Sequence, residues 1–151
     1  MALYYLDTSA LVKLYIRETG TERMLRLAHP EFNHRFAVLA ISQVEFRSAL
    51  RRRQRAGDID QGTVAGLIQR FTQHLEATFL RQSLGEAILE LACGLIDRHP
   101  LRAYDAVQLA GCLFLKANVP AEQPTFVCAD LQLLEAAEAE GLAILNPESQ
   151  A

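Results

Sequence analysis

The sequence predicts a three-layer α/β/α fold, with a parallel sheet of four or five short strands between two layers of helices. Short apolar segments without charge, such as residues 36–41, are typical of strands buried on both faces. The longer segments between them carry apolar residues every three or four positions, as amphipathic helices do. Because the two kinds of segment alternate, right-handed crossovers between parallel strands are expected.

Strands are expected where short apolar runs meet turn residues, at residues 3–6, 36–41, 78–80, 125–128 and 142–145. Helices are expected where apolar residues recur at helical spacing, at residues 9–20, 21–28, 43–55, 60–75, 83–98, 103–117 and 130–140. Ser9 and Ser42 can cap two of these helices, and Gly20 and Gly141 can end two of them. With 151 residues, half of them hydrophobic, the chain fits one domain over residues 1–151.

Composition restricts the classes of function. Fifteen basic and eighteen acidic side chains give a net charge of -3, so the chain lacks the basic excess of a general nucleic-acid binder. Cys93, Cys112 and Cys128 lie far apart in apolar segments, which predicts buried thiols in a reducing cytosol rather than disulfides or a zinc site. The N-terminus lacks a secretion signal and no apolar stretch reaches about 20 residues, so a cytoplasmic protein without membrane contact is expected.

Four carboxylates stand beside apolar segments, where a charge without a partner is costly to bury. Asp7 and Asp130 each follow a predicted strand, whereas Glu45 and Asp105 each lie in the first turn of a predicted helix. The carboxyl ends of parallel strands are where such sheets bind ligands, so the four acids are expected on one rim. Their mutual repulsion would raise their pKa values unless divalent cations neutralised them, and such oxygen ligands suit Mg²⁺ or Mn²⁺.

Each acid also has a purely structural alternative. Asp7 and Asp130 can be N-caps of the helices that follow them. Ser42 and Glu45 fit a capping box, in which the glutamate reaches back to the backbone amide of the cap residue. A helix start also favours negative charge at Asp105, although the apolar residues around it indicate an interior cleft.

Phosphodiester hydrolysis is the chemistry that matches a cluster of metal-binding acids. One metal ion can lower the pKa of the attacking water while a second, roughly 4 Å away, stabilises the leaving oxygen. The alternative is phosphoryl transfer through an aspartyl intermediate, because an acid after the first strand also begins the haloacid-dehalogenase-type phosphatases. Those usually carry a second aspartate two residues later, where this chain has Ser9.

Four ordered segments carry a family resemblance: residues 5–13, 42–45, 101–110 and 126–130. In these segments the chain resembles the PIN-domain nucleases, and most closely the VapC-type toxin ribonucleases of type II toxin–antitoxin pairs. The resemblance implies a Mg²⁺- or Mn²⁺-dependent endoribonuclease, usually a homodimer, that a small antitoxin inhibits by inserting its tail into the acidic cleft. The alternatives are a PIN nuclease that is not a toxin and a PIN-like scaffold that binds RNA or protein without cutting.

The resemblance also assigns roles to the acids. Asp7 and Asp105 are the expected main metal ligands, and Glu45 and Asp130 are expected to complete the catalytic pocket directly or through water. The chain departs from the family at Cys128-Ala129, because the family often has a small hydroxyl residue before the last acid.

Polar and basic residues near the acids are the expected substrate contacts. Thr8, Ser9 and Arg102 are the predicted substrate-binding residues, and Thr8 or Ser9 can also fix the first carboxylate. Arg102 can bind a phosphate or pair with an acid. Five further arginines between residues 47 and 55 can hold RNA phosphates, or they can simply form a solvated helix face.

Overall fold

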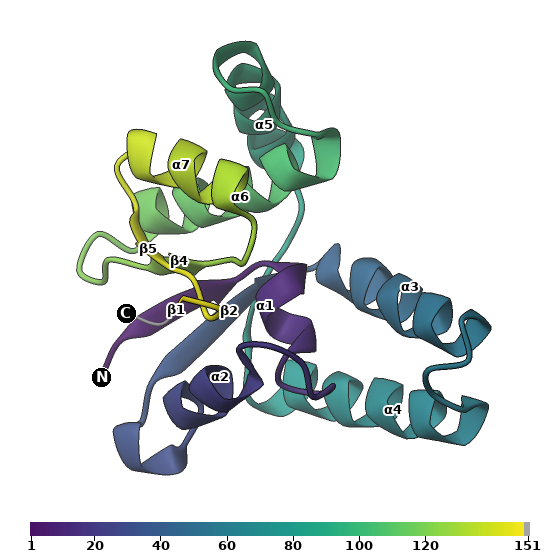
Figure 1. Ribbon diagram of the computed structural model, residues 1–151. Helices are drawn as coiled ribbons and strands as arrows, with labels where there is room; N and C mark the ends of the chain where they lie inside the picture. The colour runs from purple at the N-terminus through teal and green to yellow at the C-terminus, as the bar shows by residue number, and fades with distance from the viewer. Residues whose placement is uncertain (150–151) are drawn as a thin grey trace.

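The computed structural model describes residues 1–149, so residues 150 and 151 of the predicted domain lie outside the described range. Five parallel strands form one sheet in the order β3-β2-β1-β4-β5 (Figure 1). The strands are β1 (Leu3–Leu6), β2 (Arg35–Leu39), β3 (Leu80–Gln82), β4 (Thr125–Val127) and β5 (Ala143–Leu145). The predicted parallel α/β sheet is therefore confirmed, with the larger of the two expected strand numbers.

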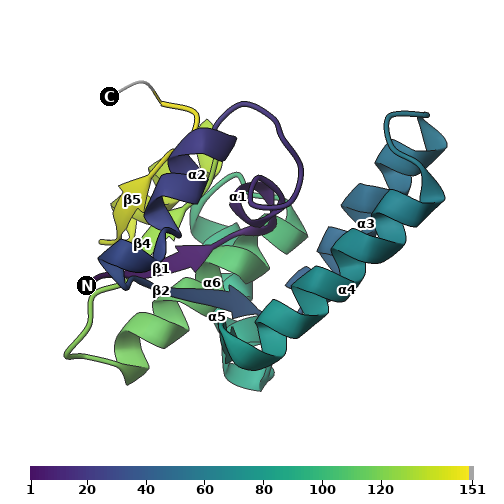
Figure 2. The same cartoon turned by 90° about the horizontal axis from the view of Figure 1, so that it is seen from below.

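Helices cover both faces of this sheet (Figure 1). One face carries α5 (Glu86–Arg98), α6 (Ala103–Asn118) and α7 (Leu131–Ala139). The other face, which Figure 2 shows from below, carries α1 (Thr8–Val12), α2 (Thr21–Leu27), α3 (Ser42–Arg55) and α4 (Gln61–Ala77). A short 3-10 helix, η1 (Pro30–Phe32), precedes β2. Within residues 1–149, no helix combines the length and the apolar character needed to cross a membrane.

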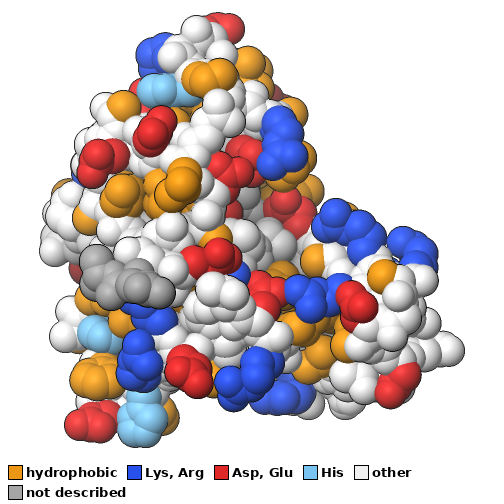
Figure 3. Space-filling view, viewed as in Figure 1, with side chains coloured by type: hydrophobic (Ala, Val, Ile, Leu, Met, Phe, Trp, Pro, Cys, Tyr) orange, Lys and Arg blue, Asp and Glu red, His pale blue; other side chains and the backbone are white. Residues whose placement is uncertain are grey.

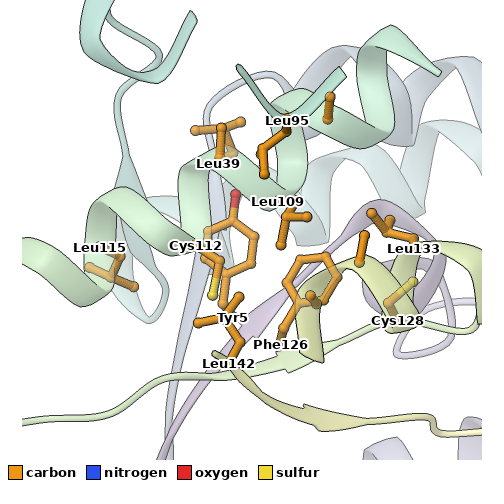
Figure 4. Packing of buried hydrophobic residues seen from close by; sticks show 14 of the residues in the cluster. Tyr5, Leu39, Leu95, Leu109, Cys112, Leu115, Phe126, Cys128, Leu133 and Leu142 are labelled. Carbon is orange, nitrogen blue, oxygen red and sulfur yellow. The ribbon is translucent and has the colours of Figure 1, made fainter. Parts of the chain in front are cut away.

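Two hydrophobic clusters fill the layers, because successive strand residues point to opposite faces of the sheet. Tyr5 and Phe126 are fully buried on the face of α5 to α7, where their rings stack 5.9 Å apart (Figure 4). Leu6 and Val127, the next residues of the same strands, belong to the cluster under α1, α3 and α4. This alternation fixes the register of the sheet.

The helix predicted over residues 9–20 is much shorter in the structure, because α1 ends at Val12. Its N-cap is Asp7 rather than Ser9. The amides of Lys13 and Leu14 bond to carbonyls three residues back, so the chain tightens into turns. The apolar pattern that predicted a longer helix reflects packing instead, because the Tyr15 ring lies 5.1 Å from that of Phe46.

Two smaller predictions also differ from the structure. The strand expected at residues 78–80 lies at Leu80–Gln82, where two polar residues on an edge strand hide the apolar signal. Cys112 and Cys128 are buried as predicted, but Cys93 is exposed because it lies on the outer face of α5. All three cysteines are free thiols.

Gly111 is required where α6 crosses β1. A Cβ atom at this position would lie 2.3 Å from the hydroxyl oxygen of Tyr5. We therefore expect Gly111→Ala to lower the free energy of unfolding by roughly 1–3 kcal/mol, through overpacking of the core. Urea unfolding measures this loss. Gly66→Ala is the control, because a Cβ at this α4 position meets nothing within 4 Å and should stabilise by about 0.5–1 kcal/mol. Equal stability of the two variants would contradict the tight contact.

Candidate active site

The four predicted acids come from segments that the sheet topology places side by side. β1 is the central strand, with β2 on one side and β4 on the other, so the chain switches direction across the sheet at β1. Asp7 directly follows β1, and Asp130 follows β4 after two residues. Glu45 and Asp105 lie in the first turns of α3 and α6. Such a switch point forms a crevice outside the carboxyl ends of the strands, where α/β folds bind ligands.

The Asp7 side chain is buried, with 6% of its surface exposed. Its Oδ1 atom accepts hydrogen bonds from the Ser9 hydroxyl (2.6 Å) and from the Ala10 amide (3.0 Å), so it caps α1. Burial raises the pKa of the Asp7 carboxyl group to about 6 although these hydrogen bonds oppose the rise, and the nearby Asp105 charge contributes to it. The capping bonds use Oδ1, and a hydrogen bond from the Cys128 side chain also lowers the pKa of this carboxyl group.

The two hydroxyl residues after Asp7 connect the acids to one another. Thr8 donates a hydrogen bond of 2.9 Å to Oε1 of Glu45, which joins the start of α1 to the start of α3. Ser9 accepts a bond of 3.2 Å from the amide of Ala129, in the loop that leads to Asp130. Thr8 and Ser9 therefore hold the acid-bearing segments together.

Glu45 does not form the capping box that its local sequence suggests. The N-cap of α3 is Ile41, and no side chain caps this helix. The Glu45 carboxylate instead turns toward the sheet, where Oε1 accepts bonds from Thr8 and from the side-chain amide of Gln108 (2.6 Å). The partner that decides its orientation thus lies 63 residues away in the chain.

Gln108 is the functional-site residue that the sequence analysis missed. It is 2% exposed, and its Nε2 donates toward Glu45 (2.6 Å), Ser42 (3.1 Å) and Thr8 (3.3 Å). Its Oε1 accepts a bond of 3.2 Å from the Tyr5 hydroxyl. The sequence did contain a signal for this residue, because Gln108 is a polar side chain within the apolar run of α6, three residues after Asp105. A polar side chain buried there needs hydrogen-bond partners.

The Arg102 guanidinium lies close to both Asp105 and Asp130. Arg102 Nε donates to Asp105 Oδ2 at 3.3 Å, and the same guanidinium lies 3.9 Å from Asp130 Oδ2. Burial raises the pKa of Asp105, Arg102 opposes that rise, and the Asp130 charge adds to it. Asp130 also caps α7, because its Oδ1 accepts a bond of 3.1 Å from the Leu133 amide. Asp130 is therefore the N-cap of α7, and its second carboxylate oxygen lies near the Arg102 guanidinium.

Cys128 occupies the place where the resemblance leads one to expect a small hydroxyl residue. Its Sγ accepts a bond of 3.2 Å from the Asp130 amide, so the thiol shapes the loop between β4 and α7. Burial raises the pKa of the Cys128 thiol far above its usual value, and the Asp7 charge raises it further. The side chain is therefore a neutral thiol beside the acids.

The acids fit a hydrated divalent cation better than a fully protein-ligated one. Within the described residues, no group of three or more His, Cys, Asp or Glu side chains is arranged to hold a metal ion directly. Asp7 and Asp105 nevertheless interact closely enough for the charge of Asp105 to raise the pKa of Asp7. Mg²⁺ usually keeps several waters and binds proteins through one or two carboxylates. Two oxygen-donor side chains are therefore sufficient.

A cleft of about 980 Å³ is lined by Glu45 but not by the other three predicted acids. Thr8, Ser9 and Glu45 line one part of it, and Arg52 and Arg53 of α3 line another. Figure 3 shows basic side chains gathered over α3, with acidic side chains beside them on the same face. The cleft is therefore acidic at Glu45 and basic along the arginines of α3.

A second residue that the sequence analysis did not single out lies at the far side of this cleft. Lys13 is 3% exposed and pairs with Glu18 (2.9 Å) and Glu148 (2.8 Å). Glu18 also pairs with Arg53, so one of the α3 arginines serves the structure of the cleft wall. Arg52 makes no ion pair with any residue between 1 and 149 and remains available to an anion.

Known proteins resemble this chain in sequence and in fold. Residues 4–120 match the family model described as PIN domain. Ribonuclease VapC46 of Mycobacterium tuberculosis is 32% identical over 152 residues, which cover 97% of this chain and 99% of that protein. Among solved structures, PAE2754 of Pyrobaculum aerophilum has a TM-score of 0.65 at 20% identity, over 97% of this chain and 85% of that one. A toxin–antitoxin complex from Klebsiella pneumoniae has a TM-score of 0.61 at 17% identity, over 95% and 97% of the two chains.

The two structural neighbours support the fold alone, since their sequences differ greatly from this one. The family match and the relation to VapC46 are stronger, because the first spans residues 4–120 and the second spans almost both complete chains. The chain therefore belongs to the PIN domain family.

Proposed function

We propose that this protein is a Mg²⁺- or Mn²⁺-dependent endoribonuclease and the toxin component of a type II toxin–antitoxin pair. The observation that carries the proposal is the buried Asp7 carboxyl group, whose pKa is raised to about 6 beside Asp105 at the end of the central strand. Buried carboxylates that repel each other favour a divalent cation. The relation to Ribonuclease VapC46 supports RNA as the substrate.

Each residue of the site has a role in this mechanism. Asp7 and Asp105 would hold the ion, which would supply a lowered pKa for a water molecule and stabilisation of charge on the phosphate. Glu45 is fixed through Oε1, so its Oε2 would be free to orient the attacking water, and Asp130 would complete the acidic pocket directly or through water. Arg102 has a side chain that is 67% exposed, so it can exchange its acid partners for an RNA phosphate.

The proposal includes protein partners. A small antitoxin is supported by the likeness to the Klebsiella pneumoniae toxin–antitoxin complex. A homodimer is supported by the outer face of α5, where Leu89, Cys93 and Ile96 are exposed at helical spacing. A cytoplasmic location is supported by the three free thiols.

Metal-dependent RNA cleavage by the purified protein tests the proposal. We expect single-stranded RNA to be cut in Mg²⁺ or Mn²⁺ but not with excess chelator. Asp105→Asn should lower kcat by at least about 100-fold, because metal stabilisation of the transition state is worth several kcal/mol. Asp97→Asn is the matched control, since Asp97 is exposed on α5 away from the site. RNA binding without cleavage would indicate a scaffold, and hydrolysis of a small phosphomonoester instead would indicate a phosphatase.

A further inference from the structure

Tyr104 is a large aromatic side chain exposed beside the acids. It lies in the first turn of α6, directly before Asp105, and 49% of its surface is exposed. It also lines the cleft of about 980 Å³ together with Glu45 and Arg52. Neither capping nor core packing explains an aromatic ring at this place.

The position of the ring is defined by Arg102. The guanidinium carbon of Arg102 lies 4.9 Å from the ring centroid of Tyr104, in a cation–π arrangement. The same guanidinium bonds to Asp105 and approaches Asp130. The Tyr104 ring and the carboxylates of Asp105 and Asp130 are therefore all neighbours of one guanidinium group.

The cleft offers three kinds of contact within a short span. Tyr104 provides a flat apolar surface, Arg52 of α3 provides a positive charge, and Glu45 lies at the acidic end. An unpaired nucleotide has a base that stacks on aromatic rings and a phosphate that binds arginine. A paired base in a duplex has both faces covered by its neighbours, so it cannot use such a ring.

We propose that Tyr104 is the stacking platform for one unpaired base of single-stranded RNA, and that it places the neighbouring phosphate at the acids while Arg52 binds the strand. This inference rests on the ribonuclease function proposed above and adds how the chain binds single-stranded RNA, namely by stacking one base on Tyr104. It makes Tyr104 a substrate-binding residue that the PIN match does not assign.

The test measures how tightly the full chain binds a fluorescein-labelled single-stranded RNA of about ten nucleotides, with Ca²⁺ in place of Mg²⁺. Tyr104→Ala should weaken binding about 5- to 100-fold, whereas Tyr104→Phe, which keeps the ring, should bind like the wild type. Phe32→Ala is the control, because Phe32 is also 49% exposed but lies before β2, at the opposite end of the strands.

Abasic substitution identifies the stacked base. A series of RNAs, each lacking one base, should contain one member for which Tyr104→Ala causes no further loss. In Mg²⁺, the variant should raise KM with little change in kcat, because it removes binding and not chemistry. If Tyr104 acted only by positioning Asp105, its replacement would lower kcat instead.

The outcomes separate this inference from the function on which it rests. Wild-type cleavage combined with unchanged binding by Tyr104→Ala, or equal loss for duplex and single-stranded RNA, would overturn the stacking platform alone. Loss in Tyr104→Phe equal to that in Tyr104→Ala would also overturn it. Absence of any RNA binding or cleavage by the wild type would remove both proposals.

Discussion

Asp7→Asn should abolish RNA cleavage and at the same time stabilise the metal-free protein at neutral pH. The loss of one proposed metal ligand should lower kcat by roughly 10²- to 10⁴-fold, since metal stabilisation of the transition state is worth several kcal/mol. Asparagine keeps the capping oxygen that accepts bonds from Ser9 and Ala10, so α1 should still form. Loss of activity would therefore not reflect unfolding.

The gain in stability follows from the pKa of Asp7. The folded-state value of about 6 exceeds the ordinary value of 3.8, so the folded protein binds this proton more tightly than the unfolded chain does. The favourable contribution is complete below pH 4 and is lost as the pH rises through 6. The difference corresponds to roughly 3 kcal/mol, which asparagine does not lose because it carries no charge.

Urea unfolding in chelator at pH 4 and pH 7.5 measures this effect. The advantage of Asp7→Asn over the wild type should be small at pH 4 and should approach its full value at pH 7.5. Asp60→Asn is a matched control of opposite sign: Asp60 caps α4, and its hydrogen bond from the Thr63 amide lowers its pKa. Added Mg²⁺ should stabilise the wild type but not Asp7→Asn. An Asp7→Asn variant less stable than the wild type at pH 7.5 would contradict a buried charged carboxyl group.

The alternation of apolar strands and amphipathic helices in the sequence was sufficient to predict which edge of the sheet carries Asp7 and Asp130. Asp7 and Asp130 stand at the ends of uncharged strands, and parallel strands necessarily bring such ends to one edge of the sheet. The edge strand β3 was misplaced by two residues, because Arg81 and Gln82 give it no apolar pattern. Burial on both faces is what makes a strand recognisable in sequence, and an edge strand lacks it.

The contacts inside the site could not be predicted in the same way. The segment from Ser42 to Glu45 fits a capping box, which is a local pattern, yet Glu45 bonds to Gln108 and Thr8 instead. The bond between Tyr5 and Gln108 joins residues 103 positions apart. Local spacing predicts local partners, whereas these partners meet only after the sheet and α6 have packed together.

Gln108→Leu should impair catalysis although Gln108 is not itself one of the proposed metal ligands. The substitution removes the amide that fixes Glu45 and leaves the buried Tyr5 and Ser42 hydroxyls without this partner. Loss of such an orienting residue typically costs 10- to 100-fold in activity or metal affinity. The unsatisfied polar groups should also lower the free energy of unfolding by roughly 1–3 kcal/mol.

Gln108→Glu separates an orienting role from a merely structural one. A second carboxylate at the 2.6 Å position next to Glu45 cannot remain ionised together with it, so the pair should retain a proton and the pKa of one member should rise. RNA cleavage by this variant should then have a pH profile shifted to higher pH, which Gln108→Leu should not show. Gln69→Leu is the control, because Gln69 is exposed on α4. A Gln108→Leu enzyme that folds stably and cleaves at the wild-type rate would show that Glu45 needs no support from α6.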